Sequence, residues 1–148
     1  MGNRTIVKNR KAFFEYKILD VYSAGIQLKG SEVKSIRNSK VSLNESYCYI
    51  NNNEVFIKSM HIAEYSKGHT DFNHNPLRDK KLLLKKKEIT KLNDAISQKG
   101  LTIIPLELFL NEKGLIKVEI GLAKGKHLYD KKETIKLRDL YRVLKQNI

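Results

Sequence analysis

Residues 101–123, which read LTIIPLELFLNEKGLIKVEIGLA, contain two apolar segments separated by a polar turn. From Ile116 onward every second residue is apolar, which is the period that buries one face of a β-strand. The separating residues 111–114 are Asn-Glu-Lys-Gly, and both Asn and Gly favour turns. The stretch therefore predicts a β-hairpin with strands over 101–110 and 115–123.

The chain before this hairpin shows the same kind of pattern. Apolar and charged residues alternate over 14–18, which predicts a half-buried strand. A short strand is predicted between the two glycines of residues 25–30 (GIQLKG). A second hairpin is predicted over 47–57, because three asparagines at 51–53 separate two apolar runs and Asn tolerates the left-handed backbone conformation.

Two short helices and a long loop complete this part of the chain. Ser31 is a suitable cap for a helix that extends to about Asn38, since its hydroxyl can accept from the first free amides. A helix over about 87–99 is predicted to end at Gly100. The polar stretch 66–81 predicts a long functional loop. Several short strands with turn signals and few helices indicate a mainly β fold, a small closed β-barrel.

The last residues differ from the rest and predict a division into a domain over 1–129 and a tail over 130–148. Asp130 and Glu133 have the spacing of a helix capping box. The apolar residues that follow share one helical face, and they are Leu137, Leu140, Tyr141, Leu144 and Ile148. Two interpretations of the tail stay open, a helix packed on the barrel or a segment that folds on a partner.

Composition narrows the classes of function. The chain has 148 residues, of which 41% are hydrophobic and 30% charged, and this is a globular composition. Its 29 Lys and Arg against 16 Asp and Glu give a net charge of +13, which indicates a polyanionic partner. The single Cys48 fits a reducing compartment. No apolar stretch is long enough for a membrane span, and no secretory signal is visible, so a cytoplasmic protein is expected.

The sequence argues against catalysis. His69, Asp71 and His74 share one loop and are the only candidate metal ligands, but short polar loops with two histidines are common and we expect no metal. No phosphate-binding glycine loop and no nucleophile with a credible base are present. We therefore expect a protein without enzymatic activity and without a cofactor.

Basic clusters beside aromatic residues favour RNA as the polyanion. Residues 78–92 hold seven cations and two acids, and residues 117–138 hold seven cations and three acids. A third cluster lies within residues 4–11, followed by Phe13 and Phe14. Lys and Arg engage phosphates and an exposed aromatic ring can stack on an unpaired base. A membrane-surface helix needs cations on one face and bulky apolar residues on the other, and only the tail approaches that pattern.

Six motifs, in order from about Asn9 to Arg138, resemble the SsrA-binding protein family, the small protein B of trans-translation. Two of them, Gly-Ser-Glu-Val-Lys-Ser at 30–35 and Leu-Ala-Lys-Gly-Lys at 122–126, are together highly specific to that family. The six matched segments are 9–12 (NRKA), 24–37 (AGIQLKGSEVKSIR), 60–62 (MHI), 81–84 (KLLL), 99–106 (KGLTIIPL) and 117–126 (KVEIGLAKGK).

The resemblance implies an oligonucleotide-binding-like β-barrel with flanking helices and a basic C-terminal tail. It implies a non-enzymatic adaptor, a monomer when free, that binds the tRNA-like domain of transfer-messenger RNA. Such proteins deliver that RNA to stalled ribosomes together with elongation factor Tu. Their tail occupies the empty messenger channel near the decoding centre of the small subunit. The alternative that remains is a binding module for other structured RNA, such as ribosomal RNA.

The matched motifs also imply site residues. Those expected to bind RNA are Asn9, Arg10, Lys11, Tyr16, Leu83, Lys117, Lys124 and Lys126. Those expected to bind the ribosome through the tail are Tyr129, Asp130, Lys131, Lys132, Lys136, Arg138 and Arg142.

Two positions depart from the family pattern, and three matched positions are expected to have a structural role rather than to bind RNA. Ser23 stands where the family often has a Glu that contributes to RNA binding. Lys132 replaces an Arg, which keeps the charge and loses the bidentate fork. Within the matched motif, Val33 and Ile36 are expected in the core, and Glu32 is expected to pair with a neighbouring cation.

Overall fold

A computed structural model describes residues 3–65 and 73–125 of the chain, and the predicted tail, with Lys126 and Tyr129, lies outside these described residues. The described part is mainly β with short helices, as predicted. The elements in order are β1 (Arg4–Lys8), α1 (Arg10–Glu15), β2 (Tyr16–Ile26), α2 (Gly30–Arg37), β3 (Val41–Ser42), β4 (Tyr47–Asn51), β5 (Glu54–Lys58), β6 (His61–Ile62), β7 (Lys80–Leu83), α3 (Lys86–Lys99), β8 (Thr102–Leu110) and β9 (Ile116–Gly125).

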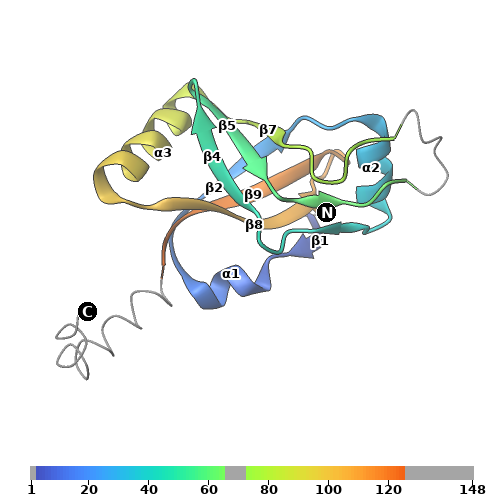
Figure 1. Cartoon of the computed structure of the whole chain (residues 1–148), viewed down its shortest axis with the longest axis horizontal. Coiled ribbons are helices and arrows are strands. Elements are labelled where there is room, and N and C mark those ends of the chain that lie inside the picture. The colour runs from blue at the N-terminus through green and yellow to red at the C-terminus, as the bar shows by residue number, and fades with distance from the viewer. Residues whose placement is uncertain (1–2, 66–72, 126–148) are drawn as a thin grey trace.

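The principal sheet closes on itself. Its strands follow the order β1-β8-β4-β5-β7-β2-β9, and β9 pairs in addition with β8. This last pairing joins the two ends of the sheet, so the strands from β8 to β9 form a ring. β4 pairs with the start of β8 and β1 with its second half. The helices α1, α2 and α3 lie at three different places around the ring (Figure 1).

Both long C-terminal strands are buried on two faces. The fully buried Ile103, Leu108, Val118 and Ile120 belong to the main core inside the ring. On the opposite side, Ile104, Leu106 and Ala123 form a smaller cluster with Ala12 of α1. Helix α1 therefore covers a second apolar surface of the β8–β9 hairpin.

A close approach of three strands occurs at Gly121 in β9. A β-carbon at this position would lie 2.9 Å from Leu106 Cδ1 and 3.0 Å from Ile18 Cγ2. Side chains do not approach so closely without displacement, so only glycine fits between β2 and β8 at this point.

Both predicted hairpins are confirmed. Strands β4 and β5 are joined by Asn52 and Asn53, whose φ angles are +52° and +60°, the left-handed conformation that Asn tolerates. Strands β8 and β9 are joined through Gly114, with φ of +80°. The helix predicted over about 87–99 is α3, and Gly100 ends it with φ of +64°.

The strand predicted over 14–18 begins too early. Residues 10–15 form α1, and β2 begins only at Tyr16. The Asn9 side chain accepts a hydrogen bond from the Ala12 amide and begins the helix, while Ala12 is its buried residue. The alternation over 14–18 is thus split between two elements, and Phe14 is 77% exposed on the helix.

Three further expectations near this region were wrong in detail. Residues 25–30 are not a separate strand, because Gly25 and Ile26 complete the long strand β2 and pair with β7. The helix predicted to be capped by Ser31 begins two residues earlier, at Gly30, and Lys29 rather than Ser31 is its cap, since the Glu32 carboxylate accepts from the Lys29 amide at 2.7 Å. The predicted loop over 66–81 ends sooner, since β7 begins at Lys80.

Lys80 is a cation inside the core. Its side chain is 0% exposed and its Nζ donates to the Met60 carbonyl oxygen at 2.8 Å. Burial lowers the pKa of Lys80 from 10.5 to about 8, although the nearby Glu32 carboxylate acts in the opposite direction. Burial therefore disfavours the charged ammonium relative to the unfolded chain.

This burial predicts an unusual dependence of stability on pH. Between about pH 8 and 10.5 the unfolded chain keeps the Lys80 proton that the folded protein has lost, so stability rises with pH. We expect the free energy of unfolding to rise by about 1 kcal/mol between pH 7 and 9. Urea denaturation at these pH values checks this. Lys80→Met should remove the rise, and an unchanged rise in that variant would contradict the assignment.

Candidate nucleic-acid interface

Two of the RNA-binding residues expected from sequence, Leu83 and Lys117, line one groove of about 410 Å³, here called the Leu83 groove. Its walls come from the end of β2, α2, β7, the β8–β9 turn and the start of β9. Leu83 is 46% exposed and Leu115 58% exposed, so the floor and rim offer apolar surface to a ligand. The residues that line it include Gly25, Leu28, Val33, Leu83, Leu115 and Lys117.

The groove depends on two local features. Gly25 pairs with Leu83 across β2 and β7, and a β-carbon on Gly25 would come within 3.3 Å of Leu83 Cβ. A larger residue at position 25 would press against Leu83, so the glycine allows Leu83 to keep its position in the groove. On the other side, Arg37 Nη2 donates to the Gly114 carbonyl oxygen at 3.2 Å, which ties the β8–β9 turn to α2.

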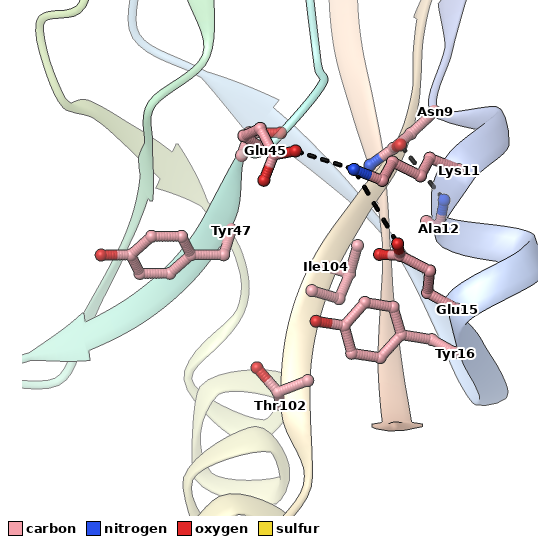
Figure 2. Close-up of a pocket in the computed structure, with 10 residues that line it drawn as sticks. Asn9, Lys11, Ala12, Glu15, Tyr16, Glu45, Tyr47, Thr102 and Ile104 are labelled. Carbon is pink, nitrogen blue, oxygen red and sulfur yellow. Dashed lines mark hydrogen bonds and ion pairs between the residues drawn. The ribbon is translucent and has the colours of Figure 1, made fainter. Parts of the chain in front are cut away.

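Three other expected residues, Asn9, Lys11 and Tyr16, line a separate cavity of about 360 Å³, here called the Tyr16 pocket. Figure 2 shows Tyr16 and Tyr47 with Ile104 between them, and Lys11 directed toward the carboxylates of Glu45 and Glu15. A flat aromatic side chain from each of two strands and an apolar floor suit a planar ligand such as a base.

The polar groups of the Tyr16 pocket are partly engaged within the protein. Lys11 Nζ lies 2.8 Å from Glu45 Oε2 and 3.8 Å from Glu15 Oε2. The hydrogen bond to Glu45 raises the pKa of Lys11 and lowers that of Glu45. Asn9 is buried, and its Nδ2 donates to the Pro105 carbonyl oxygen at 2.9 Å. Asn9 therefore shapes this pocket by holding α1 against β8.

The remaining expected cations lie elsewhere. Arg10 lines a third groove of about 380 Å³ with Lys8, Phe13 and Phe14. Lys124 is exposed on β9, opposite Lys17 of β2. The expected RNA-binding residues within the described part of the chain therefore lie on separate surfaces and do not form one patch. The expected tail residues and Lys126 lie outside the described residues.

Sequence reasoning missed several groove residues. Leu28 and Leu115 line the Leu83 groove, and Tyr47 lines the Tyr16 pocket. The signal for Leu115 was present, since it is a large apolar residue directly after the turn glycine. Tyr47 gave no such signal, because only the pairing of distant strands places it beside the matched motifs. Leu28 lies within the matched segment 24–37, but nothing in that motif marked it as a groove residue.

Glu32, Val33 and Ile36 behave largely as expected. Ile36 is fully buried in the core, and Val33 is half-buried in the groove wall. Glu32 pairs with Arg78, so its expected partnership with a cation is confirmed.

His74 has a structural position. It is buried, with Nδ1 at 2.8 Å from Ser31 Oγ and Nε2 at 2.8 Å from the Ile62 carbonyl oxygen. Within residues 3–65 and 73–125 no group of three potential metal ligands occurs; His69 and Asp71 lie outside these residues. In the same part of the chain, no helix has the length and apolar character needed to cross a membrane.

Grooves with exposed apolar side chains and flanking cations, on a ring of strands with a net charge of +13, are typical of a nucleic-acid-binding β-protein. A family model described as "SmpB protein" matches residues 6–148. The chain belongs to the SmpB protein family.

Individual relatives agree with this membership. The SsrA-binding protein of Christiangramia forsetii is 54% identical over 144 residues, which cover 97% of this chain and 91% of the relative. The SsrA-binding protein of Cytophaga hutchinsonii is 56% identical over 133 residues, covering 90% and 86%. A solved chain described as "tmRNA-SmpB: a journey to the center of the bacterial ribosome" has a TM-score of 0.67 and 45% identity, and the match covers 81% of this chain and 83% of that one. The family resemblance inferred from the motifs is therefore confirmed.

Proposed function

We propose that this protein is a cytoplasmic, non-enzymatic adaptor that binds the tRNA-like domain of transfer-messenger RNA and brings it to stalled ribosomes. The observation that carries this proposal is the Leu83 groove. Matched family positions from three distant segments, Gly25, Leu83 and Lys117, meet there. An exposed Leu can pack against a base or sugar while Lys117 neutralises a phosphate, which is the combination that RNA recognition requires.

The proposal also covers the architecture of the protein and its partners. The ring of strands acts as an oligonucleotide-binding-like barrel that grips the RNA, and the protein is a monomer when free. Elongation factor Tu accompanies the RNA in the delivery complex. The tail over 130–148 occupies the empty messenger channel near the decoding centre, where its cations meet ribosomal RNA. The relatives' names support the RNA partner, and the solved chain described as tmRNA-SmpB in the bacterial ribosome supports the ribosome as the destination.

Recovery of bound RNA from cells tests the proposal against its alternative. The tagged full-length protein is purified from growing cells and the associated RNA is sequenced. We expect one dominant species, transfer-messenger RNA, and its loss with the Leu83→Asp variant, because a carboxylate in the groove repels phosphate. Ribosomal RNA as the dominant species, equally recovered by the variant, would support a general module for structured RNA instead.

The salt dependence of binding tests the role of Lys117 directly. Each phosphate neutralised by a cation releases counterions, so log affinity falls linearly with log salt concentration. We expect Lys117→Ala to weaken binding to the tRNA-like domain and to reduce that slope by about 0.9. Titration by fluorescence anisotropy at several salt concentrations measures it. Lys91→Ala, on the exposed face of α3, is the matched control and should leave the slope unchanged.

A further inference from the structure

An ion pair with a buried carboxylate and a partly exposed guanidinium adjoins the residues that line the Leu83 groove. The Glu32 carboxylate is 0% exposed and accepts two hydrogen bonds from one guanidinium, from Arg78 Nη2 at 2.6 Å and from Arg78 Nε at 3.0 Å. Burial alone raises the pKa of Glu32, but the hydrogen bonds from Arg78 and from the Lys29 amide lower it below its ordinary value. The pair is thus charged and bidentate, the geometry that fixes both side chains in orientation.

The same two side chains hold the backbone on both sides of Leu28. Glu32 Oε1 accepts from the Lys29 amide at 2.7 Å, and Arg78 Nη2 donates to the Gln27 carbonyl oxygen at 3.4 Å. Leu28 lines the groove, while Glu32 and Arg78 are not among the residues that line it. The connection from β2 to α2 is therefore held by this ion pair together with one backbone bond, from the Gln27 amide to the Lys81 carbonyl oxygen at 2.9 Å.

A second contact fixes the same turn of α2. The Ser31 hydroxyl bonds the buried His74, which also bonds the Ile62 carbonyl oxygen. The first turn of α2 is thus anchored by side chains from the segment that precedes β7. Val33, the residue after Glu32, is the next groove-lining position.

We propose that the Glu32–Arg78 pair is a positioning device for RNA recognition, which sets affinity by holding Leu28 and Val33 against Leu83 without touching the RNA. This inference rests on the proposed function of the groove. It also opposes the simplest electrostatic expectation. Glu32 places a negative charge close to a surface that binds phosphates, so removal of that charge would by itself strengthen RNA binding.

The sign of the effect of Glu32→Gln is therefore diagnostic. We expect this variant to bind the tRNA-like domain about tenfold more weakly, because a groove that is not preorganised must be ordered on binding. Glu54→Gln is the matched control, since it also removes one carboxylate, from the more exposed Lys81–Glu54 pair on neighbouring strands. The control should bind as the wild type does or slightly more tightly.

A second variant separates position from charge. Arg78→Lys keeps the net charge but loses the bidentate fork, so we expect weaker binding with an unchanged salt slope. Circular dichroism establishes the folded fraction of each variant. Leu92→Ala, a core substitution in α3, lowers stability without changing the groove. Its folded fraction should therefore bind the tRNA-like domain with wild-type affinity.

The outcomes are distinct. Glu32→Gln binding as tightly as the wild type, or more tightly, would overturn the inference, and so would normal binding by a folded Arg78→Lys. If Glu32→Gln does not fold, Arg78→Lys decides. If the wild type itself shows no affinity for the tRNA-like domain, the proposed function fails. If the wild type binds and the variants bind equally well, only the positioning role fails.

Discussion

A protein truncated after Tyr129 is expected to keep its fold and its RNA binding and to lose ribosome rescue completely. Every strand of the described ring lies before residue 126, and β9 already reaches Gly125, which pairs with Tyr16. The described grooves are also built from residues before that point. In the proposed function the removed residues are those that enter the messenger channel, so nothing in the truncated protein would take their place.

Three measurements on the truncated protein test this separation. Circular dichroism and anisotropy titration report the fold and the affinity for the tRNA-like domain. Tagging of peptides on ribosomes stalled at the end of a broken message reports rescue. A truncated protein that still supports tagging would contradict the role proposed for the tail. A truncated protein that does not fold would favour the other interpretation, a helix packed on the barrel.

The substitution Gly121→Val is expected to destabilise the protein strongly. Its β-carbon alone would lie 2.9 Å from Leu106 Cδ1, 3.0 Å from Ile18 Cγ2 and 3.4 Å from the Asp20 carbonyl oxygen. One of these contacts is with backbone and the others are with packed side chains, so little relaxation is open to the site. Overpacking of this kind costs about 1–3 kcal/mol and occasionally more, a large share of the roughly 5–15 kcal/mol that stabilises a typical domain.

Urea denaturation compares this variant with Gly30→Ala. Gly30 is the first residue of α2, and a β-carbon there would have nothing within 4 Å. Since Ala is favoured over Gly in a helix, the control should be as stable as the wild type or slightly more so. A Gly121→Val protein with wild-type stability would show that β2 and β8 separate more easily at this point than their packing indicates.

The parts of the fold that were predictable are those in which local sequence and tertiary structure agree. The two hairpins and α3 carry their own turn or stop residues, such as Asn53, Gly114 and Gly100. Helix α1 was missed because residues 14–18 alternate like a strand, although Asn9 caps the helix locally through the Ala12 amide. The contacts that hold the helix in place are those of Asn9 with β8 and of Ala12 with the small cluster. Such contacts link residues that are far apart in the chain, so no local pattern contains them.

The candidate site followed a similar division. Family motifs identified Leu83 and Lys117, and only the sheet order places them in one groove. Asn9 was expected to contact RNA, but its side chain is engaged within the protein, so its proposed contribution is indirect. The role of Arg78 could not be predicted, because it arises from hydrogen bonds to Glu32 and to the Gln27 carbonyl oxygen, which are far from it in the chain. Leu28 lies within the matched segment 24–37, but the motif alone does not show that it lines a groove.

The order of strands in the ring also affects how the protein is made. β2 is completed by residue 26, yet its partners β7 and β9 lie at residues 80–83 and 116–125. β1, made first of all, waits for β8 at residues 102–110. Such nonlocal pairing is slow to form and leaves strand edges open during synthesis. A nascent chain that stops before residue 102 therefore cannot close the ring and exposes edges prone to aggregation, so folding of this protein depends on its own translation continuing through β9.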